Sequence, residues 1–311
     1  MIALVAGGAG FIGSHLCEAL LGAGHRVLCV DNYISGLPEN VTHLRGHAGF
    51  RLIEHDLIQP LPVTWPVDAI FNLASPASPP YYLAHPIETA RVNAQGSYHL
   101  LELAKQHGAR YLQASTSEVY GDPLVHPQPE SYWGNVNPNG IRSCYDEGKR
   151  FAESLVMDYY RLGLDARIIR IFNTYGPRNR PDDGRVVPNF IDRALRRLPL
   201  PVHGDGSQTR SFCYVEDLVR GILAAQLHDG TRGEVFNLGN PGEFTMLELA
   251  ELVQRLTGEA RGLEFQPARE DDPTRRRPDI TKATAMLGWA PQVNLEEGLR
   301  RTIAWFREHG A

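Results

Sequence analysis

The chain of 311 residues lacks a long apolar run, a cysteine framework and a large excess of charge. A transmembrane helix needs about 20 consecutive apolar residues, and the sequence contains no such stretch, so no membrane association is expected. The net charge of −5 gives no reason to expect nucleic acid or an anionic membrane as a partner. With 42% hydrophobic and 22% charged residues, the composition is that of an ordinary globular protein.

Cysteine and histidine give no sign of a disulfide framework or a metal centre. The four cysteines, Cys17, Cys29, Cys144 and Cys213, are scattered without paired spacing, and the 12 histidines are dispersed. We therefore expect buried free thiols in a reducing compartment, the cytoplasm, and no bound metal. The apolar residues 2–6 lead directly into a glycine turn, so they are expected to form a core strand and not a signal peptide.

A glycine-rich segment follows this first strand. Residues 7–13 read Gly-Gly-Ala-Gly-Phe-Ile-Gly, and residues 14–23 then have the apolar spacing of a helix. Glycines let the main chain approach a pyrophosphate, and the helix N-terminus offers N–H donors to it. The order of strand, glycine turn and helix predicts a dinucleotide site, with these cofactor-binding residues: Gly7, Gly10, Phe11, Ile12 and Gly13.

An acidic residue, Asp31, ends the second predicted strand, residues 26–30. An acid after a strand is often only a turn residue, but this one is in register with the glycines. In that place a carboxylate binds the adenosine ribose and repels a 2′-phosphate, so NAD is favoured over NADP. Further cofactor contacts are expected at Asn32, Ser35, Gly36, Asp56, Leu57, Leu73, Ala74 and Asn93.

Strand and helix patterns alternate up to residue 171, which predicts a Rossmann-type, doubly wound parallel sheet. Further strands are expected at 50–54, 69–73, 111–114 and 166–171, and helices at 88–107, 145–162, 246–257 and 295–308. Regular elements are also expected at 212–214, 219–226 and 235–238. After residue 173 the pattern loosens among several prolines, as expected for a substrate-covering region. We expect an NAD-binding domain from 1–175 with about 212–240, and a smaller C-terminal α/β substrate domain from 176–211 and 241–311.

Tyr145 and Lys149 lie four residues apart, so on a helix they share one face. A Lys ammonium beside a buried phenol favours the phenolate and lowers its pKa, which makes a proton acceptor for an alcohol that loses hydride. Thr116 can bind the same oxygen, and Glu118 brings a carboxylate to the pocket. The Tyr-x-x-x-Lys spacing alone occurs by chance in many helices, but the preceding nucleotide signature favours catalysis.

The Gly-x-x-Gly-x-x-Gly spacing together with Tyr-x-x-x-Lys resembles the short-chain dehydrogenase/reductase superfamily. Within its extended branch, the chain resembles the UDP-glucuronate decarboxylase (UDP-xylose synthase) family nearly from end to end. The N-terminal membrane anchor of some animal and plant members is not expected in this protein. The segments that carry the likeness are 72–80, 115–123, 144–149, 173–178, 183–187, 206–212 and 277–279.

The resemblance implies oxidation at C4 of UDP-glucuronate by NAD, loss of the C5 carboxylate as CO2, and reduction at C4 to give UDP-xylose. The catalytic residues that it implies are Thr116, Ser117, Glu118, Tyr145, Lys149 and Arg276. Related 4,6-dehydratases carry Asp where this chain has Ser117, and serine is a poor general acid for dehydration. Glu118 disfavours simple 4-epimerases, and Ser117 argues modestly against apiose-forming relatives, which carry Cys there.

Glu118 is expected near the substrate carboxylate, where repulsion between like charges favours CO2 loss or raises the pKa of one partner. The proton that returns to C5 could come from Ser117, from Tyr145 or from a water held by Glu118. Whether the product is UDP-xylose or a released 4-keto-pentose also stays open.

Binding of the diphosphate and the carboxylate calls for arginine, which grips both anions bidentately. The resemblance places Arg210, Arg276 and Asn173 near the diphosphate or sugar. Which of the adjacent arginines 275–277 reaches the site is open, and Arg185 could instead pair with a neighbouring aspartate. The remaining substrate-binding candidates, besides Thr116 and Tyr145, are Ser75, Tyr81, Arg91, Arg178, Arg185, Val187 and Gln208.

Three alternatives stay open: a UDP-glucuronate 4-epimerase or another nucleotide-sugar epimerase or dehydratase, a decarboxylase that stops at the 4-keto-pentose, and a non-enzymatic NAD-binding protein. Family members are commonly dimers that pack helices 88–107 and 145–162 into a four-helix bundle, so a homodimer is expected. Phe151, Leu155 and Tyr159 fit either such an interface or a buried core face.

Overall fold

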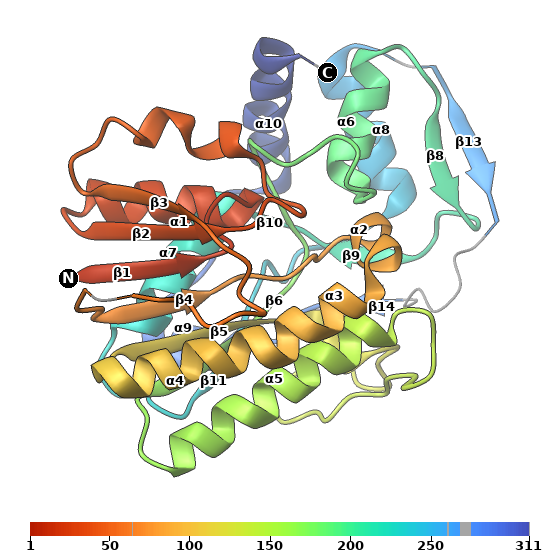
Figure 1. Cartoon of the computed structure of the whole chain (residues 1–311). Helices are drawn as coiled ribbons and strands as arrows, with labels where there is room; N and C mark the ends of the chain where they lie inside the picture. Colours follow the sequence, from red (N-terminus) through yellow and green to blue (C-terminus); the bar gives the residue numbers. More distant parts are fainter. Residues whose placement is uncertain (64, 260, 268–274, 311) are drawn as a thin grey trace.

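A seven-stranded parallel sheet forms the centre of the molecule (Figure 1). The computed structural model describes residues 1–63, 65–259, 261–267 and 275–310. The strand order is β11-β6-β5-β4-β1-β2-β3, so the chain adds strands to one side as far as β3 and then, from β4 on, to the other side of β1. The switch point between β1 and β4 is the usual place of a ligand crevice in such sheets. The predicted Rossmann-type fold is confirmed. The strands are β1 (Ile2–Ala6), β2 (Arg26–Asp31), β3 (Phe50–Glu54), β4 (Ala69–Asn72), β5 (Arg110–Thr116), β6 (Ala166–Ile171) and β11 (Val235–Leu238).

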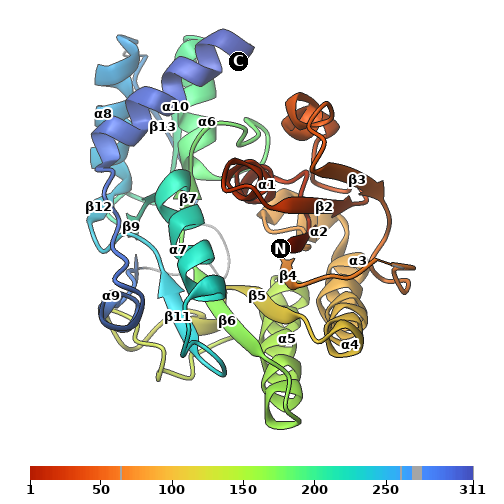
Figure 2. The same ribbon diagram turned by 90° about the vertical axis from the view of Figure 1, so that its left-hand side faces the viewer.

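Helices cover both faces of this sheet, as Figure 2 shows from the side. One face is covered by α1 (Phe11–Gly22), α7 (Val215–Leu227) and α9 (Thr281–Leu287), and α1 and α7 bury Leu16 and Ile222 in the core on this side. The other face is covered by α4 (Ser97–His107) and α5 (Ser143–Arg161), which bury Leu100 and Val156. Because helices cover both faces of the sheet, a buried strand such as β1 is apolar on both sides and does not alternate with polar residues.

Several helices differ by a few residues from their predicted bounds, and two of these differences concern the site. The first begins at Phe11, three residues earlier than expected, because Gly10 already serves as its N-cap. The predicted helix 88–107 begins at Pro86 and consists of α3 (Pro86–Arg91), a π-helical turn (Val92–Gly96) and α4. Single π turns inside helices are frequent at functional sites, and this one contains Asn93.

A second apolar cluster lies beyond the sheet, in the upper right of Figure 1. It joins α6 (Val186–Leu195), α8 (Met246–Thr257) and α10 (Leu295–His309) around Phe190, Leu249 and Ile303. Small sheets pair β8 (Leu200–His203) with β13 (Leu263–Gln266), β7 (Thr174–Tyr175) with β10 (Cys213–Tyr214), and β12 (Glu243–Thr245) with β9 (Thr209–Ser211) and β14 (Arg275–Arg276).

Helix α6 lies in the region that the sequence pattern left irregular. Its first residues, Val186, Val187 and Pro188, favour extended chain, but proline in the first turn loses no helical hydrogen bond. The apolar face of α6 then packs on α8 and α10, so tertiary contacts decide its conformation. Among the described residues, no helix combines the length and the apolar sequence that crossing a bilayer requires.

Candidate active site

A cavity of about 540 Å³ opens at the carboxyl ends of the central strands, within the range usual for small-ligand sites. A smaller cavity of about 90 Å³ adjoins it beside β2. Both are lined by Gly7, Gly10, Ser35, Leu73 and Ser75, so they share one wall. Together they offer an elongated site with its glycine turn in the middle.

The glycine turn is packed too closely to admit side chains. A Cβ atom on Gly13 would lie 2.1 Å from the Gly7 carbonyl oxygen, and Gly7 itself has a φ of +75° with the Ala74 nitrogen 2.9 Å from its Cβ position. The bare main chain and the start of α1 thus form a cradle for a pyrophosphate. Phe11 and Ile12 line the larger cavity beside it.

Asp31 anchors the smaller cavity. Its carboxylate accepts hydrogen bonds from the Ala9 and Tyr33 nitrogens, each at 2.9 Å. Burial raises the pKa of Asp31 above its ordinary value, and these backbone donors oppose the shift. A Cβ on Gly36 would lie 2.9 Å from both carboxylate oxygens, so glycine keeps the carboxylate accessible. The other predicted cofactor residues that line this cavity are Asn32, Ser35, Asp56, Leu57, Leu73 and Ala74.

We expect Asp31→Ser to reduce the preference for NADH over NADPH by about tenfold or more, because a 2′-phosphate would no longer meet a carboxylate. Fluorescence titration of cofactor-free protein with each nucleotide measures the ratio. An unchanged ratio would show that Asp31 serves only to hold the turn through Ala9 and Tyr33.

The predicted catalytic residues meet on the wall of the larger cavity. Thr116 ends β5, and Tyr145 and Lys149 project from α5. The Tyr145 ring stacks on Tyr82 with centroids 5.2 Å apart and an interplanar angle of 5°. The Lys149 Nζ donates to the Ala114 carbonyl oxygen at 2.9 Å and lies 5.8 Å from the Tyr145 ring centroid. The spacing of four residues thus places both groups on one helix face, as predicted.

The expected lowering of the Tyr145 pKa is wrong for the protein alone. Burial raises the pKa of Tyr145 to about 12, although a hydrogen bond with Thr116 opposes the shift. Burial also lowers the pKa of Lys149 to about 7, and the charge of Glu153 opposes that shift. Both groups are therefore held toward their neutral forms, because the loss of solvent outweighs the hydrogen bond and the charge that oppose it.

Glu118 is held by two arginines. Both guanidinium Nη atoms of Arg276 donate to its carboxylate, one of them at 3.0 Å, and Arg142 donates at 2.6 Å. Burial alone would raise the pKa of Glu118, but the charges of Arg276 and then Arg142 lower it to about 2. The raised pKa that we considered for a carboxylate in this pocket does not occur at Glu118, which is ionised.

Arg276 is the member of the 275–277 run that reaches the cavity. It is 2% exposed and lines the wall, whereas Arg275 is exposed to solvent. The main-chain nitrogen of Arg277 donates to Gln128. The pairing of β14 with β9 places Arg276 opposite Arg210, which also lines the cavity.

Three residues at this site were missed by the sequence analysis: Tyr82, Arg142 and Asp146. Tyr82 and Arg142 line the cavity, and Asp146 is buried just behind it. Burial and the charge of Glu118 raise the pKa of Asp146 to about 7. Arg142 and Asp146 stand near Tyr145 in the sequence, but charged residues at the start of a helix are usually solvated. Tyr82 is far from Tyr145 in the sequence, and only the tertiary structure stacks the two rings.

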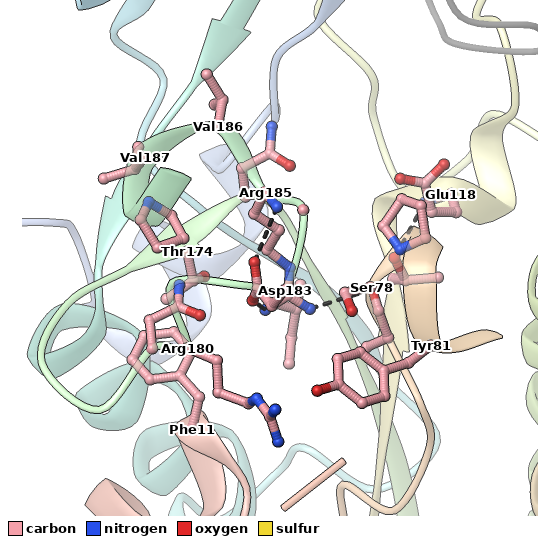
Figure 3. Close-up of a pocket in the computed structure, with 18 of the residues that line it drawn as sticks. Phe11, Ser78, Tyr81, Glu118, Thr174, Arg180, Asp183, Arg185, Val186 and Val187 are labelled. Atoms are coloured by element: carbon pink, nitrogen blue, oxygen red, sulfur yellow. Dashed lines mark hydrogen bonds and ion pairs between the residues drawn. The ribbon is translucent and has the colours of Figure 1, made fainter. Parts of the chain in front are cut away.

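The substrate candidates surround the far part of the cavity. Arg185 donates to Asp183 and to the Ala77 carbonyl oxygen, so the turn-anchoring ion pair considered above is present, yet the side chain lines the cavity. In Figure 3 this pair lies in the middle of the view, with Glu118 and Tyr81 on one side and Val187 and Phe11 on the other. The other candidates that line the cavity are Ser75, Ser117, Asn173, Arg178, Gln208 and Arg210.

Some of the predicted binding residues are held by other side chains of the protein. Arg178 has a φ of +65° and donates to Glu18 on α1 at 2.5 Å. Arg91 is exposed, donates to Gln95 at 3.0 Å and lines neither cavity. Asn93 also lies behind the wall, where it donates to the Ser75 hydroxyl at 3.0 Å. Asn93 can therefore position Ser75 without touching a ligand itself.

The sheet order, the glycine cradle and the group of Thr116, Tyr145 and Lys149 define an extended short-chain dehydrogenase/reductase. Residues 3–239 match the NAD dependent epimerase/dehydratase family. The chain is 54% identical over 305 residues to UDP-glucuronic acid decarboxylase 1 of Arabidopsis thaliana, which covers 98% of this chain and 69% of that protein. The chain belongs to this family and, within it, to the UDP-glucuronic acid decarboxylases.

Solved structures share the fold over nearly the whole chain. The dTDP-glucose 4,6-dehydratase DesIV of Streptomyces venezuelae, with NAD and TYD bound, has a TM-score of 0.90 and 31% identity, over 99% of this chain and 98% of that one. The UDP-glucuronic acid 4-epimerase of Bacillus cereus, in complex with UDP-glucuronic acid and NAD, has a TM-score of 0.89 and 29% identity, over 99% of both chains. NAD is the cofactor of this chain, as predicted, and the cradle and Asp31 fit it.

Proposed function

We propose that the chain converts UDP-glucuronate to UDP-xylose and CO2 with bound NAD. The observation that carries this proposal is Glu118, ionised between Arg276 and Arg142 next to the Thr116–Tyr145–Lys149 group. A cavity that already combines one carboxylate with two guanidinium groups can receive a second carboxylate, that of the uronic acid. The 54% identity with a UDP-glucuronic acid decarboxylase supports the same assignment.

The first step oxidises the C4 carbinol to a ketone. NAD, when bound, would supply the hydride acceptor for this oxidation and the hydride donor for the last reduction. Tyr145 takes the proton of the C4 hydroxyl, and Thr116, which shares a hydrogen bond with Tyr145, orients that oxygen. Lys149 would hold the nicotinamide ribose, and its positive charge would stabilise the phenolate. Tyr145 gives the proton back when the ketone is reduced.

The 4-ketone lies β to the carboxylate, so the bond from C5 to the carboxyl carbon can break while its electron pair moves toward the ketone oxygen. CO2 departs, and a proton returns to C5. Glu118, with a pKa of about 2, is a poor direct proton donor at neutral pH. Its role is to hold the arginines and a water, which leaves that water, Ser117 or Tyr145 as the C5 donor.

Carbon-resolved NMR of the products tests the assignment. After incubation of the enzyme and NAD with uniformly ¹³C-labelled UDP-glucuronate, we expect a UDP-pentose and labelled CO2. Galacturonate with all six carbons would identify the chain as a 4-epimerase, and a 4-keto-pentose with lasting nicotinamide absorbance would identify a truncated reaction. Recovery of the substrate unchanged would favour a non-enzymatic NAD-binding role.

We further propose that residues 1–175 with about 212–240 act as the NAD-binding domain, and 176–211 with 241–311 as the nucleotide-sugar domain. The separate apolar cluster around α6, α8 and α10 supports this division. A cytoplasmic location is part of the same proposal, supported by four free cysteines, of which Cys17, Cys29 and Cys213 are buried.

We also propose a homodimer in which α3, α4 and α5 pair with the same helices of a second copy. Ile87, Tyr98 and Phe151 on these helices are 67%, 47% and 52% exposed, which is unusual for large apolar side chains. We expect Phe151→Glu to convert a dimer to a monomer in sedimentation equilibrium at micromolar concentration. Leu124→Glu, at a residue 76% exposed outside these helices, is the matched control. A monomeric parent protein, or a Phe151→Glu variant that stays dimeric, contradicts the proposed interface.

A further inference from the structure

Glu153 lies on the catalytic face of α5 without reaching the cavity. It follows Tyr145 by eight residues and Lys149 by four, so all three side chains project toward the sheet. The Ser115 hydroxyl donates to its Oε1 at 2.6 Å. Arg170, on β6, donates to both carboxylate oxygens at 2.9 and 2.7 Å. With its side chain 13% exposed, Glu153 is a nearly buried carboxylate with three donors.

The hydrogen bonds continue beneath the catalytic segment 115–120. Arg170 also donates to the Tyr120 hydroxyl at 2.9 Å, and Tyr120 donates to Asn237 on β11 at 2.8 Å. Ser115 precedes Thr116, and Tyr120 ends the 3₁₀ turn (Ser117–Tyr120) that carries Glu118. The network thus holds this segment at both ends, and Glu153 connects it to the helix that carries Tyr145 and Lys149.

Lys149 is buried, and the carboxylate whose charge acts on it, that of Glu153, is on the same helix. Its Nζ donates to the Ala114 carbonyl oxygen, a neutral partner. Burial lowers the pKa of Lys149 to about 7, and Glu153 acts against that shift. The other ionisable groups that face this pair are Tyr145 on α5, Arg170 on β6 and Tyr120 on the 3₁₀ turn.

We propose that Glu153 is a positioning residue for hydride transfer, which anchors Ser115 beneath Thr116 and favours the protonated form of Lys149 beside Tyr145. The inference deepens the proposed function, because a charged Lys149 is what stabilises the Tyr145 phenolate. It needs no contact between Glu153 and the substrate or the cofactor.

The charge of Lys149 can be observed directly. The chain contains three lysines, Lys105, Lys149 and Lys282, so protein with ¹³C-labelled lysine gives few Cε signals. Glu153→Gln keeps the shape of the side chain and removes its charge. We expect the Lys149 signal to titrate about 1 unit or more lower in pH than in the parent protein. Lys282, which pairs with Glu234 at 2.6 Å, should titrate as before.

Kinetics provide the second measurement. With less Lys149 protonated, we expect the alkaline limb of the kcat profile of Glu153→Gln to move to lower pH, with little change in KM. Glu153→Asp keeps the charge but shortens the reach to Ser115, so it should restore the Lys149 titration while kcat stays low. Glu147→Gln, at a surface residue that pairs with Arg150, is the matched control.

An unchanged Lys149 titration in folded Glu153→Gln would overturn the electrostatic role, and an unshifted kcat profile would overturn the positioning role. If Glu153→Gln does not fold, Ser115→Ala decides the positioning role: a lower kcat with an unchanged Lys149 titration supports the proposal, and an unchanged kcat overturns it. Failure of the parent protein to release CO2 would refute the proposed function instead, and the NMR titration would remain valid without substrate.

Discussion

Tyr145→Phe is expected to lower turnover about 10³-fold while NAD and the UDP-sugar remain bound. The phenol is the group placed to take the C4 hydroxyl proton, since it shares a hydrogen bond with Thr116 on the cavity wall. Phenylalanine keeps the ring that stacks on Tyr82, so the shape of the cavity should be preserved. The loss should therefore appear in kcat and not in binding.

Rapid-mixing absorbance of the reduced nicotinamide reports C4 oxidation directly, and isothermal titration reports binding of UDP-glucuronate. Tyr132→Phe is the control, because the Tyr132 hydroxyl accepts a hydrogen bond from the Leu124 nitrogen outside both cavities. It should retain the activity of the parent protein. Turnover of Tyr145→Phe within tenfold of the parent would mean that another group removes the C4 proton.

Local patterns in the sequence predicted the sheet, the glycine cradle and Asp31, because each depends on a strand and the turn that follows it. Tyr145 and Lys149 were found for the same reason, since their spacing lies within one helix. Helix α6 was missed because its Val-Val-Pro start favours extended chain and only packing against α8 and α10 overrides that preference.

The electrostatics of the site were less predictable. Arg276 lies 158 residues from Glu118 in the sequence, and only the tertiary structure brings the two side chains together. The pKa of Tyr145 was expected to fall and instead rises, because its direction depends on burial, which no local spacing reveals. Residue types therefore indicated the chemistry, whereas the tertiary structure decides which groups are charged.

Glu118→Gln is expected to slow CO2 release about 10²-fold and to lower stability by about 3 kcal/mol. The change leaves the buried guanidinium of Arg276 without its ionised partner, and such uncompensated charges are costly. In the parent protein the pKa of Glu118 falls from 4.5 to about 2, so its stabilisation is present above about pH 4.5 and is lost as the pH falls toward 2. Denaturant titrations of both proteins at pH 7 and pH 3.5 should show a smaller difference at pH 3.5.

The same variant separates oxidation at C4 from decarboxylation. Thr116, Tyr145 and Lys149 are unchanged in Glu118→Gln, so the reduced nicotinamide signal should still appear and then persist while labelled CO2 forms slowly. Glu118→Asp, which keeps the charge with a shorter reach, should recover part of the stability and of the CO2 release. If the nicotinamide signal and CO2 release fell by the same factor, Glu118 would act through substrate binding or the first step. In that case its pairing with Arg276 and Arg142 would serve to shape the cavity before oxidation begins.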